Sequence, residues 1–360
     1  MEDEEIKIKP TWEHLSHNQS IAFASCMKVS AFLSIAGSSI VIYQILAPHK
    51  REVMLKTMYH RIILTLSLMD IIGSLALFMS TWPIPKDTVH DDWIWGNVGN
   101  QITCDIQGYF VQSSVLSVSI STSFLCIYFM LLIRYNWSER RLRRMELVMR
   151  MIICFIFVIS LVPLFYDAYN PTPVACWIQA YPIGCSTSTS DEFKCTRGAK
   201  IKWLRFFYMV VPIVFNMITI FVTMSLLYAS VRKQDQVDSR YTRSSNNQPS
   251  SRRSRKVFVK VVWFIGSFCL VWIPIFLNSV AMSYNYYNFW LFIISIVMIP
   301  LQGFFNAIIY NYEKLKNTDF MRRTSLLRIM GRGSAESVAR AATIVANLDT
   351  LSENNLMEND

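Results

Sequence analysis

The sequence predicts an all-α fold: a polytopic membrane protein built as a seven-transmembrane helix bundle, with its N-terminus outside the membrane. Charged residues make up 17% of the 360-residue chain, and its mean hydropathy is +0.30, whereas soluble domains carry about 25% charge. Seven stretches of 19 to 28 residues are almost free of charge, and each can cross about 30 Å of hydrocarbon at about 1.5 Å per residue. Most Lys and Arg residues lie in alternate connections between these stretches, which places those connections in the cytosol.

The chain is expected to have three parts. Residues 1–20 form a short extracellular N-terminus, residues 21–310 form the seven-transmembrane domain, and residues 311–360 form a cytosolic tail. Residues 232–256, after the fifth span, are rich in Ser, Arg, Asn and Gln, which predicts an unstructured cytosolic loop. The seven spans are expected at Ile21–Leu46, Ile62–Trp82, Ile106–Ile133, Met151–Tyr169, Phe206–Tyr228, Val261–Met282 and Phe289–Tyr310.

The first span follows Asn18-Gln19-Ser20, a sequon for N-glycosylation. Modification of Asn18 requires a lumenal position, in agreement with the orientation that the charges predict. The net charge of +10 therefore describes a basic cytosolic face that meets the lipid bilayer and protein partners, and no nucleic-acid partner is expected.

The second span contains an acidic residue near its middle. Asp70 lies twelve residues beyond Met58, which places it about 18 Å along a helix that enters from the cytosol. An isolated carboxylate at this depth costs at least about 2.5 kcal/mol. We therefore expect Asp70 to be protonated, hydrated, bound to a cation or hydrogen-bonded. In the third span, the serine-rich run 113–123 either lines a polar cavity or bonds back to its own helix.

The eight cysteines fall into two groups. Cys26, Cys126, Cys154 and Cys269 lie inside predicted spans, where cysteine usually packs as a small apolar residue. The other four lie on the outer, oxidising side, where three disulfide pairings are open to them. These four are Cys104, Cys176, Cys185 and Cys195.

Motifs in three spans resemble those of the G-protein-coupled receptors. The second span has Leu66-Ser67-Leu68-Met69-Asp70, similar to the family's LAxxD, and Cys104 lies at the outer end of the third. The sixth and seventh spans carry the residues of the family's activation motifs. In the FxxxWxP pattern these are Phe268, Trp272 and Pro274, and around the NPxxY pattern they are Pro300, Gln302, Gly303, Asn306 and Tyr310, with Ala307 in place of the proline.

Two details look more like the slime-mould cyclic-AMP receptor and secretin-like branches of the family. These are Gln302-Gly303 before Asn306, and Cys176-Trp177 in the long outer loop. The rhodopsin-like branch places an Arg 25 residues after the outer cysteine, whereas that position here is Phe129. Arg134 comes five residues later, about 7.5 Å further along a helix. We therefore do not assign to Arg134 the ionic lock that this branch forms with its arginine.

The resemblance implies a receptor of the plasma membrane that binds a small extracellular ligand and activates a heterotrimeric G protein. It also implies a disulfide Cys104–Cys176 and a rearrangement of the sixth span around Pro274. The stretch between Cys185 and Cys195 is rich in Ser and Thr and can close a small local loop, so these two cysteines are expected to bond each other. Trp272 is expected either to move with the sixth span when the ligand binds or to be an ordinary packing residue inside the bundle. Basic residues at the cytosolic ends of the helices are expected to face the G protein or lipid headgroups; they are Arg134, Arg140, Arg141, Arg143, Arg144, Arg232 and Lys233.

Other classes of membrane protein fit the sequence less well. A retinal protein requires a lysine in the seventh span, and Phe289–Tyr310 has none. A membrane metallohydrolase requires intramembrane histidines, and all five histidines lie outside the spans. We therefore expect no enzyme activity, no cofactor and no structural or catalytic metal. A channel or transporter remains the alternative, although it would require more ionisable residues at membrane depth than Lys28 and Asp70.

Three further expectations concern regulation and ligand. The family resemblance brings Asp70 close to Asn306, and Ser119 or Ser121 could complete a sodium or water site, so Asp70 and Asn306 are the predicted polar switch. Arg322-Arg323 before Thr324-Ser325 predicts phosphorylation of these two hydroxyls. Finally, the fourth connection is basic, which would suit an anionic ligand; its cations are Lys194, Arg197, Lys200, Lys202 and Arg205.

Overall fold

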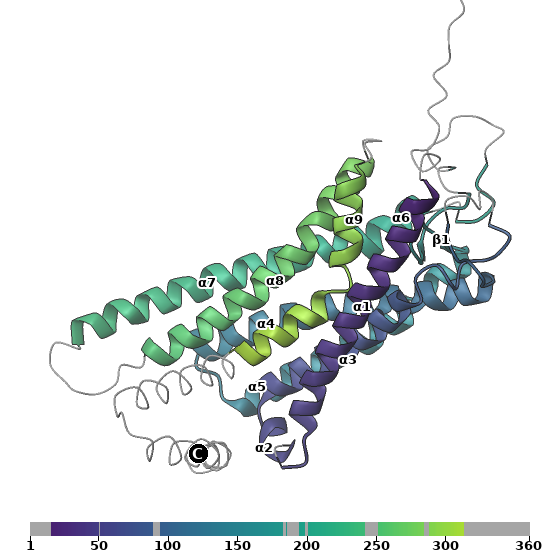
Figure 1. The fold of residues 1–360 in the computed structure, drawn as a ribbon. Helices are drawn as coiled ribbons and strands as arrows, with labels where there is room; N and C mark the ends of the chain where they lie inside the picture. Colours follow the sequence, from purple (N-terminus) through teal and green to yellow (C-terminus); the bar gives the residue numbers. More distant parts are fainter. Residues whose placement is uncertain are drawn as a thin grey trace, which may run out of the picture. The chain divides into compact units, whose positions relative to one another are not determined.

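Long helices pack side by side around one central helix in the computed structural model (Figure 1). It describes residues 16–49, 51–88, 94–182, 185, 194–198, 201–241, 251–283 and 288–312. The described residues divide into two units, one that ends at Ala307 and one that begins at Ile308. The helices are α1 (His17–Leu46), α2 (Arg51–Lys56), α3 (Met58–Phe78), α4 (Gln101–Arg134), α5 (Glu139–Ile159), α6 (Ile201–Arg205), α7 (Val211–Tyr241), α8 (Ser251–Ser283) and α9 (Phe289–Met298).

The contacts between the helices form a closed ring of which α4 is a member. Contacts join α1 to α3, α3 to α4, α4 to α7, α7 to α8 and α8 to α9, and α9 returns to α1. Helix α4 also contacts α5, α8 and the outer hairpin. Within the part of the chain that the structure describes, six helices are long and apolar enough to cross a membrane. A seventh span results if α9 and the following helix, Gln302–Tyr312, count as one. The fold is therefore the predicted seven-transmembrane bundle.

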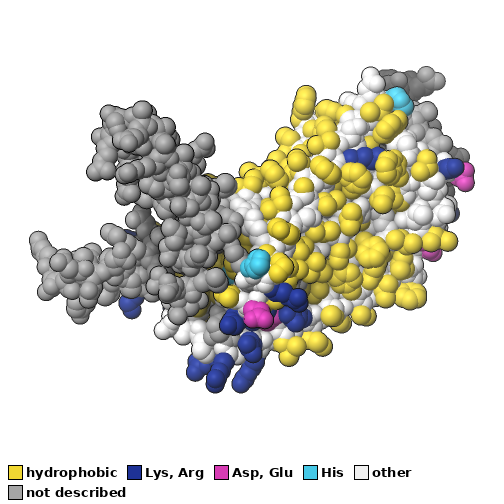
Figure 2. Space-filling model, turned by 60° about the horizontal axis from the view of Figure 1, so that its bottom comes forward, with side chains coloured by type: hydrophobic (Ala, Val, Ile, Leu, Met, Phe, Trp, Pro, Cys, Tyr) yellow, Lys and Arg dark blue, Asp and Glu magenta, His cyan; other side chains and the backbone are white. Residues whose placement is uncertain are grey.

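The outer surface of the bundle is apolar. Figure 2 shows one face covered by hydrophobic side chains, with Lys and Arg gathered toward its ends. Large side chains such as Phe32, Phe165 and Phe221 are more than half exposed, which suits contact with lipid rather than water.

Helix starts are fixed by side-chain caps. Ser16 forms a capping box with Gln19 at the start of α1, and Asn100 forms one with Thr103 at the start of α4. These caps hydrogen-bond the backbone N–H groups that the first turn of a helix leaves without partners.

Several helix ends differ from the predicted spans. Helix α5 begins at Glu139 rather than Met151 and ends at Ile159, followed by a 3₁₀ turn at Val162–Tyr166, and Tyr169 lies in a strand. Helix α7 continues to Tyr241, and helix α8 begins at Ser251. Most of residues 232–256 is therefore helical rather than unstructured. Charged residues mark where the chain leaves the hydrocarbon, but they do not end a helix. Helices commonly end at Pro, at Gly or at a cap, and none of the residues 213–241 is Pro or Gly.

The seventh span is broken. Helix α9 and the helix Gln302–Tyr312 meet at an angle of 55°, with Pro300 in the break. Proline lacks the N–H that would continue the helix ladder. This break brings Pro300 and Gln302 to the cavity described below.

A short antiparallel hairpin covers the outer end of α4. Strand β1 (Tyr169–Pro171) pairs with β2 (Cys176–Ile178), with Tyr169 opposite Ile178. The ring of Tyr169 is completely buried, and its hydroxyl donates a hydrogen bond to the Ser160 carbonyl at 2.8 Å. Burial raises the pKa of this hydroxyl above its ordinary value, so Tyr169 stays a neutral donor at physiological pH.

Candidate ligand pocket

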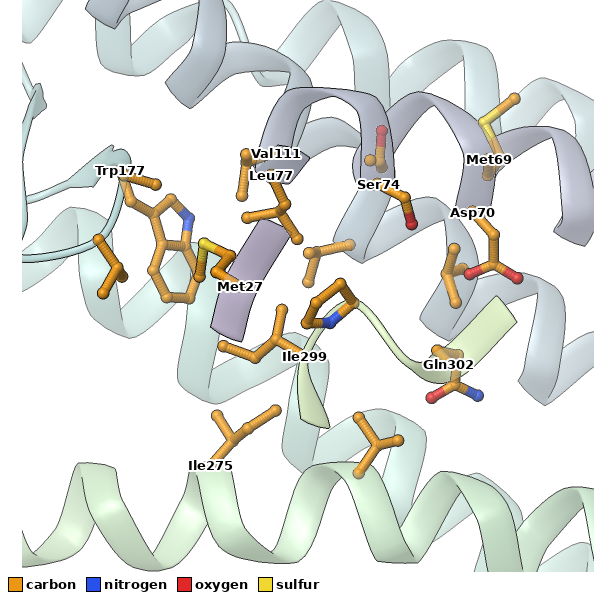
Figure 3. Close-up of a pocket in the computed structure, with 18 of the residues that line it drawn as sticks. Met27, Met69, Asp70, Ser74, Leu77, Val111, Trp177, Ile275, Ile299 and Gln302 are labelled. Atoms are coloured by element: carbon orange, nitrogen blue, oxygen red, sulfur yellow. The ribbon is translucent and has the colours of Figure 1, made fainter. Parts of the chain in front are cut away.

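A cavity lies inside the bundle, beneath the hairpin (Figure 3). Its empty space of about 840 Å³ includes volume that is open to solvent. Most of the side chains around the cavity are apolar, and Asp70 is the only charged residue among them. The lining residues are Met27, Met69, Asp70, Gly73, Ser74, Leu77, Val111, Ser114, Val115, Val118, Thr172, Val174, Ala175, Cys176, Trp177, Val271, Trp272, Ile275, Ile299, Pro300 and Gln302.

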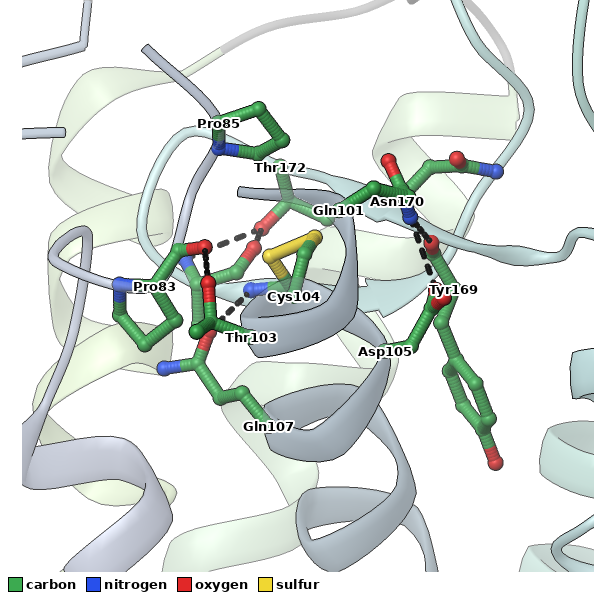
Figure 4. Close-up of a disulfide and its surroundings, with 12 residues drawn as sticks. Pro83, Pro85, Gln101, Thr103, Cys104, Asp105, Gln107, Tyr169, Asn170 and Thr172 are labelled. Atoms are coloured by element: carbon green, nitrogen blue, oxygen red, sulfur yellow. Dashed lines mark hydrogen bonds between the residues drawn. A yellow bond between two sulfur atoms is a disulfide. The ribbon is translucent and has the colours of Figure 1, made fainter. Parts of the chain in front are cut away.

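The hairpin segment Thr172–Trp177, here termed the roof, closes the cavity at its outer end. The structure has a disulfide between Cys104 of α4 and Cys176 of the roof (Figure 4). The Cys176 N–H also donates to the Gln107 side chain at 2.8 Å, and Gln107 in turn donates to the Ala76 and Ser80 carbonyls of α3 and the turn after it. The roof is therefore held to two helices by one covalent bond and a buried amide.

A second buried amide fixes the roof tryptophan. The Trp177 indole donates to Gln112 Oε1 at 2.6 Å, and Gln112 Nε2 donates to the Tyr208 carbonyl at 3.1 Å. Tyr208 lies in a π-helical turn, Phe206–Val210, just before α7. Sequence reasoning did not identify Gln107 or Gln112, although two glutamines within an apolar span are the signal that could have revealed them.

Two of the basic residues of the fourth connection, Arg197 and Arg205, are bonded to residues around the hairpin. Arg197 pairs with Asp167 at 3.1 Å and Asp105 at 3.7 Å, and donates to Asn170. Arg205 donates to the Ile178 carbonyl at 3.3 Å. Lys200 and the side chain of Lys202 lie outside the described residues. The second disulfide of the structure, Cys185–Cys195, closes a loop in the same connection.

The inner end of the cavity is polar, because Asp70, Gln302 and Ser114 line it. These three, together with the residues packed behind them, are termed the polar floor; the residues behind are Gly303, Asn306, Ser34 and Ser38. Asn306 donates to the Asp70 carboxylate at 3.2 Å, and both side chains are buried. The structure thus brings the two predicted switch residues together. Four polar atoms of the floor have no hydrogen-bond partner among the residues that the structure describes. They are the hydroxyls of Ser34, Ser38 and Ser114 and Gln302 Oε1.

The serines beside Asp70 are not the predicted ones. Ser119 and Ser121 do not line the cavity, and Ser121 donates back to the Ser117 carbonyl of its own helix. Ser117 and Ser113 do the same one and two turns earlier, so three of the six serines in this run bond to their own helix. Ser34 and Ser38, one turn apart on α1, occupy the floor instead.

Gly303 allows this close packing. A side chain there would meet the hydroxyls of Ser34 and Ser38 and come within 3.2 Å of the Asp70 Cβ atom. Gly303→Ala is therefore expected to destabilise the protein by about 1–3 kcal/mol, because it overpacks a buried contact. The measurement is the unfolding temperature of the purified protein. Gly266→Ala is the control, since nothing lies within 4 Å of the added carbon and alanine favours a helix. Equal effects of the two substitutions would contradict the proposed contact.

The sixth-span motif packs directly against the cavity. The rings of Phe268 and Trp272 are stacked 5.5 Å apart and both are buried. Trp272 and Pro300 line the cavity, and the Pro274 carbonyl accepts a hydrogen bond from Ser295 of α9 at 2.9 Å. Tyr310, by contrast, lies in the last described helix, in the second unit.

At the cytosolic ends of the helices, Arg134 donates to Ser230 of α7 at 3.3 Å. The other predicted G-protein-facing residues, namely Arg140, Arg141, Arg143, Arg144, Arg232 and Lys233, are exposed. The sequence did not reveal a buried ion pair between Arg61 of α3 and Glu146 of α5 at 2.7 Å, to which Arg150 also bonds. Asn18 is exposed in the first turn of α1, whereas Thr324 and Ser325 lie outside the described residues.

Comparisons with known proteins agree with this geometry. The family model described as "7 transmembrane receptor (rhodopsin family)" matches residues 37–310. The crystal structure of squid rhodopsin is similar to the structure with a TM-score of 0.61 and 13% sequence identity, covering 85% of this chain and 81% of the rhodopsin chain. No curated protein sequence matches the chain.

Proposed function

Because the chain belongs to the rhodopsin family of seven-transmembrane receptors, we propose that a small extracellular ligand binds in the cavity beneath the roof and drives G-protein activation. Membership makes it a multi-pass receptor, typically of the plasma membrane, rather than an enzyme, and it implies a ligand and a G protein as partners. The observation that supports the proposal most directly is the position of the cavity. It runs from the disulfide-anchored roof to Trp272 and Asp70.

The family match also corrects the branch predicted from the sequence. The slime-mould cyclic-AMP receptor-like and secretin-like assignment was wrong, since the rhodopsin-family model covers most of the chain. That assignment rested on two short motifs, Gln302-Gly303 and Cys176-Trp177, and on the presence of Phe129 where the rhodopsin-like branch has an arginine. Motifs of two residues carry much less information than a pattern extending over seven spans.

The proposed mechanism is a two-state equilibrium of the helix bundle. The ligand favours the state in which α8 pivots at Pro274 and a cytosolic cleft opens. Trp272 contacts the cavity and stacks on Phe268, so ligand contact at the cavity wall bears directly on the helix that moves. In this proposal Arg134, Arg140, Arg141, Arg143, Arg144, Arg232 and Lys233 face the G protein. Asp70 and Asn306 form the polar switch, with a sodium ion or water at the carboxylate.

The test is nucleotide exchange on purified G proteins by the receptor in lipid nanodiscs, during a screen of small molecules. Phe268→Leu, which removes a buried ring from the stack, is expected to reduce the response to any activating compound at least tenfold. Phe276→Leu is the matched control on the same helix, because Phe276 is 54% exposed. Ion flux in proteoliposomes without a G protein, together with no exchange, would favour the channel or transporter alternative instead.

A further inference from the structure

We propose that the pocket selects an uncharged, mainly apolar molecule with one hydrogen-bond-donating end, and that this end binds at Gln302 and Ser114 on the polar floor. The inference rests on the proposed function and specifies the chemistry of its ligand. Three features of the structure support it: the apolar walls, the two unpartnered polar atoms at the floor, and the placement of charge.

The walls offer almost only apolar contacts between the roof and the floor. They combine side chains of five parts of the chain, such as Met27 of α1, Leu77 of α3, Val111 of α4, Ile275 of α8 and Trp177 of the roof. Figure 3 shows these side chains around a common space. A molecule that fills this space gains mainly from burial of apolar surface.

The floor supplies two unpartnered polar atoms at the cavity: the Gln302 oxygen, which can only accept a hydrogen bond, and the Ser114 hydroxyl, which can accept or donate. Gln302 Oε1 and Ser114 Oγ are buried and line the cavity, and neither has a hydrogen-bond partner among the described residues. Gln302 is 5% exposed and Ser114 is 1% exposed. A buried carbonyl oxygen without a partner is unfavourable, and a ligand hydroxyl can satisfy it. The ligand end must therefore donate, since a second acceptor would leave the Gln302 oxygen unpaired.

The charges around the cavity disfavour an anion. Asp70 is the only charged lining residue, and it is itself an acid. Cations near the outer end are already engaged: Arg197 by Asp105 and Asp167, and Arg205 by the Ile178 carbonyl. The Lys28 ammonium lies 3.7 Å from the centre of the Trp82 ring. A buried anion therefore lacks a compensating charge among the described lining residues.

The helices set the length of the ligand. The lining extends eight residues along α3, from Met69 to Leu77, and seven along α4, from Val111 to Val118. These distances correspond to about 10–12 Å of helix. The cavity therefore suits a molecule about 10 Å long.

The experiment compares three probes of similar length: octan-1-ol, heptyl methyl ether, which lacks the donor, and octanoate, which is anionic. Radiolabelled octan-1-ol is bound to the receptor in nanodiscs, with binding to empty nanodiscs subtracted, and the other two compete. We expect the alcohol to bind about tenfold more tightly than either competitor, as one well-formed hydrogen bond predicts. Equal binding of the ether, preference for octanoate, or no specific binding of octan-1-ol would each overturn the proposal.

Gln302→Leu tests the floor itself. It is expected to abolish the difference between alcohol and ether, whereas Gln44→Leu on α1, outside the lining, should preserve it. If Gln302→Leu does not fold, Ser114→Ala is used, with a severalfold smaller difference expected. An unchanged difference in a folded floor variant would contradict the assignment. The binding assay needs no G protein, so its failure with intact nucleotide exchange overturns only the ligand class, and selective binding without exchange overturns only the proposed function.

Discussion

Replacement of both Cys104 and Cys176 by serine is expected to abolish ligand-driven G-protein activation and to lower the free energy of unfolding by about 4 kcal/mol. The bond spans 72 residues of sequence, and closing a loop of this length restricts the unfolded chain by about that amount in the chain-entropy description. Its loss also leaves the roof attached to α4 by hydrogen bonds alone, from the Cys176 N–H to Gln107 and from the Trp177 indole to Gln112. Thermal unfolding and nucleotide exchange are the two measurements.

The control is the double serine variant of the second disulfide, Cys185–Cys195. This bond spans only 10 residues, so its loss should cost less, about 3 kcal/mol or below. Neither cysteine lines the cavity, and exchange should therefore survive. Equal loss of signalling in both variants would show that the roof does not depend specifically on the bond to α4.

Asp70→Asn is expected to give a folded protein that loses agonist-driven activation by at least tenfold, together with any sodium sensitivity. Asparagine has nearly the shape of aspartate and retains an oxygen that can accept from Asn306, so the contact between α3 and the seventh span survives. What disappears is the negative charge at the floor, on which a cation-coupled switch depends. Surface expression and nucleotide exchange at several sodium concentrations separate the two roles.

Asp87→Asn, an exposed acid in the outer connection after α3, controls for removal of one charge. A second arm combines Asp70→Asn with Asn306→Asp, which moves the carboxylate across the 3.2 Å contact. Partial recovery of signalling in this double variant is expected if the charge matters more than its exact carrier. Normal signalling and unchanged sodium dependence in Asp70→Asn would contradict the cation-coupled switch and leave Asp70 with a structural role alone.

The sequence was sufficient to predict the seven spans because hydrocarbon thickness alone sets how long an uncharged stretch must be. It did not predict where helices end: Arg140 to Arg150 lie in α5, and Arg232 and Lys233 lie in α7, since charged residues outside the hydrocarbon still form helix. The contact between Asp70 and Asn306 was predicted from the family resemblance. The serines around them were missed, because which face of α1 or α4 turns inward depends on how neighbouring helices are rotated, and spacing along one helix does not encode that rotation.

The length of α8 has a mechanical consequence. Ser251 lies 23 residues before Pro274 on this helix. In the proposed mechanism the proline is therefore a pivot with an arm of about 34 Å on its cytosolic side. In that mechanism a tilt of about 10° displaces the far end of the arm by about 6 Å, roughly the rise of one helical turn. A change too small to alter most contacts around Trp272 is thereby magnified into a displacement large enough to admit part of another protein.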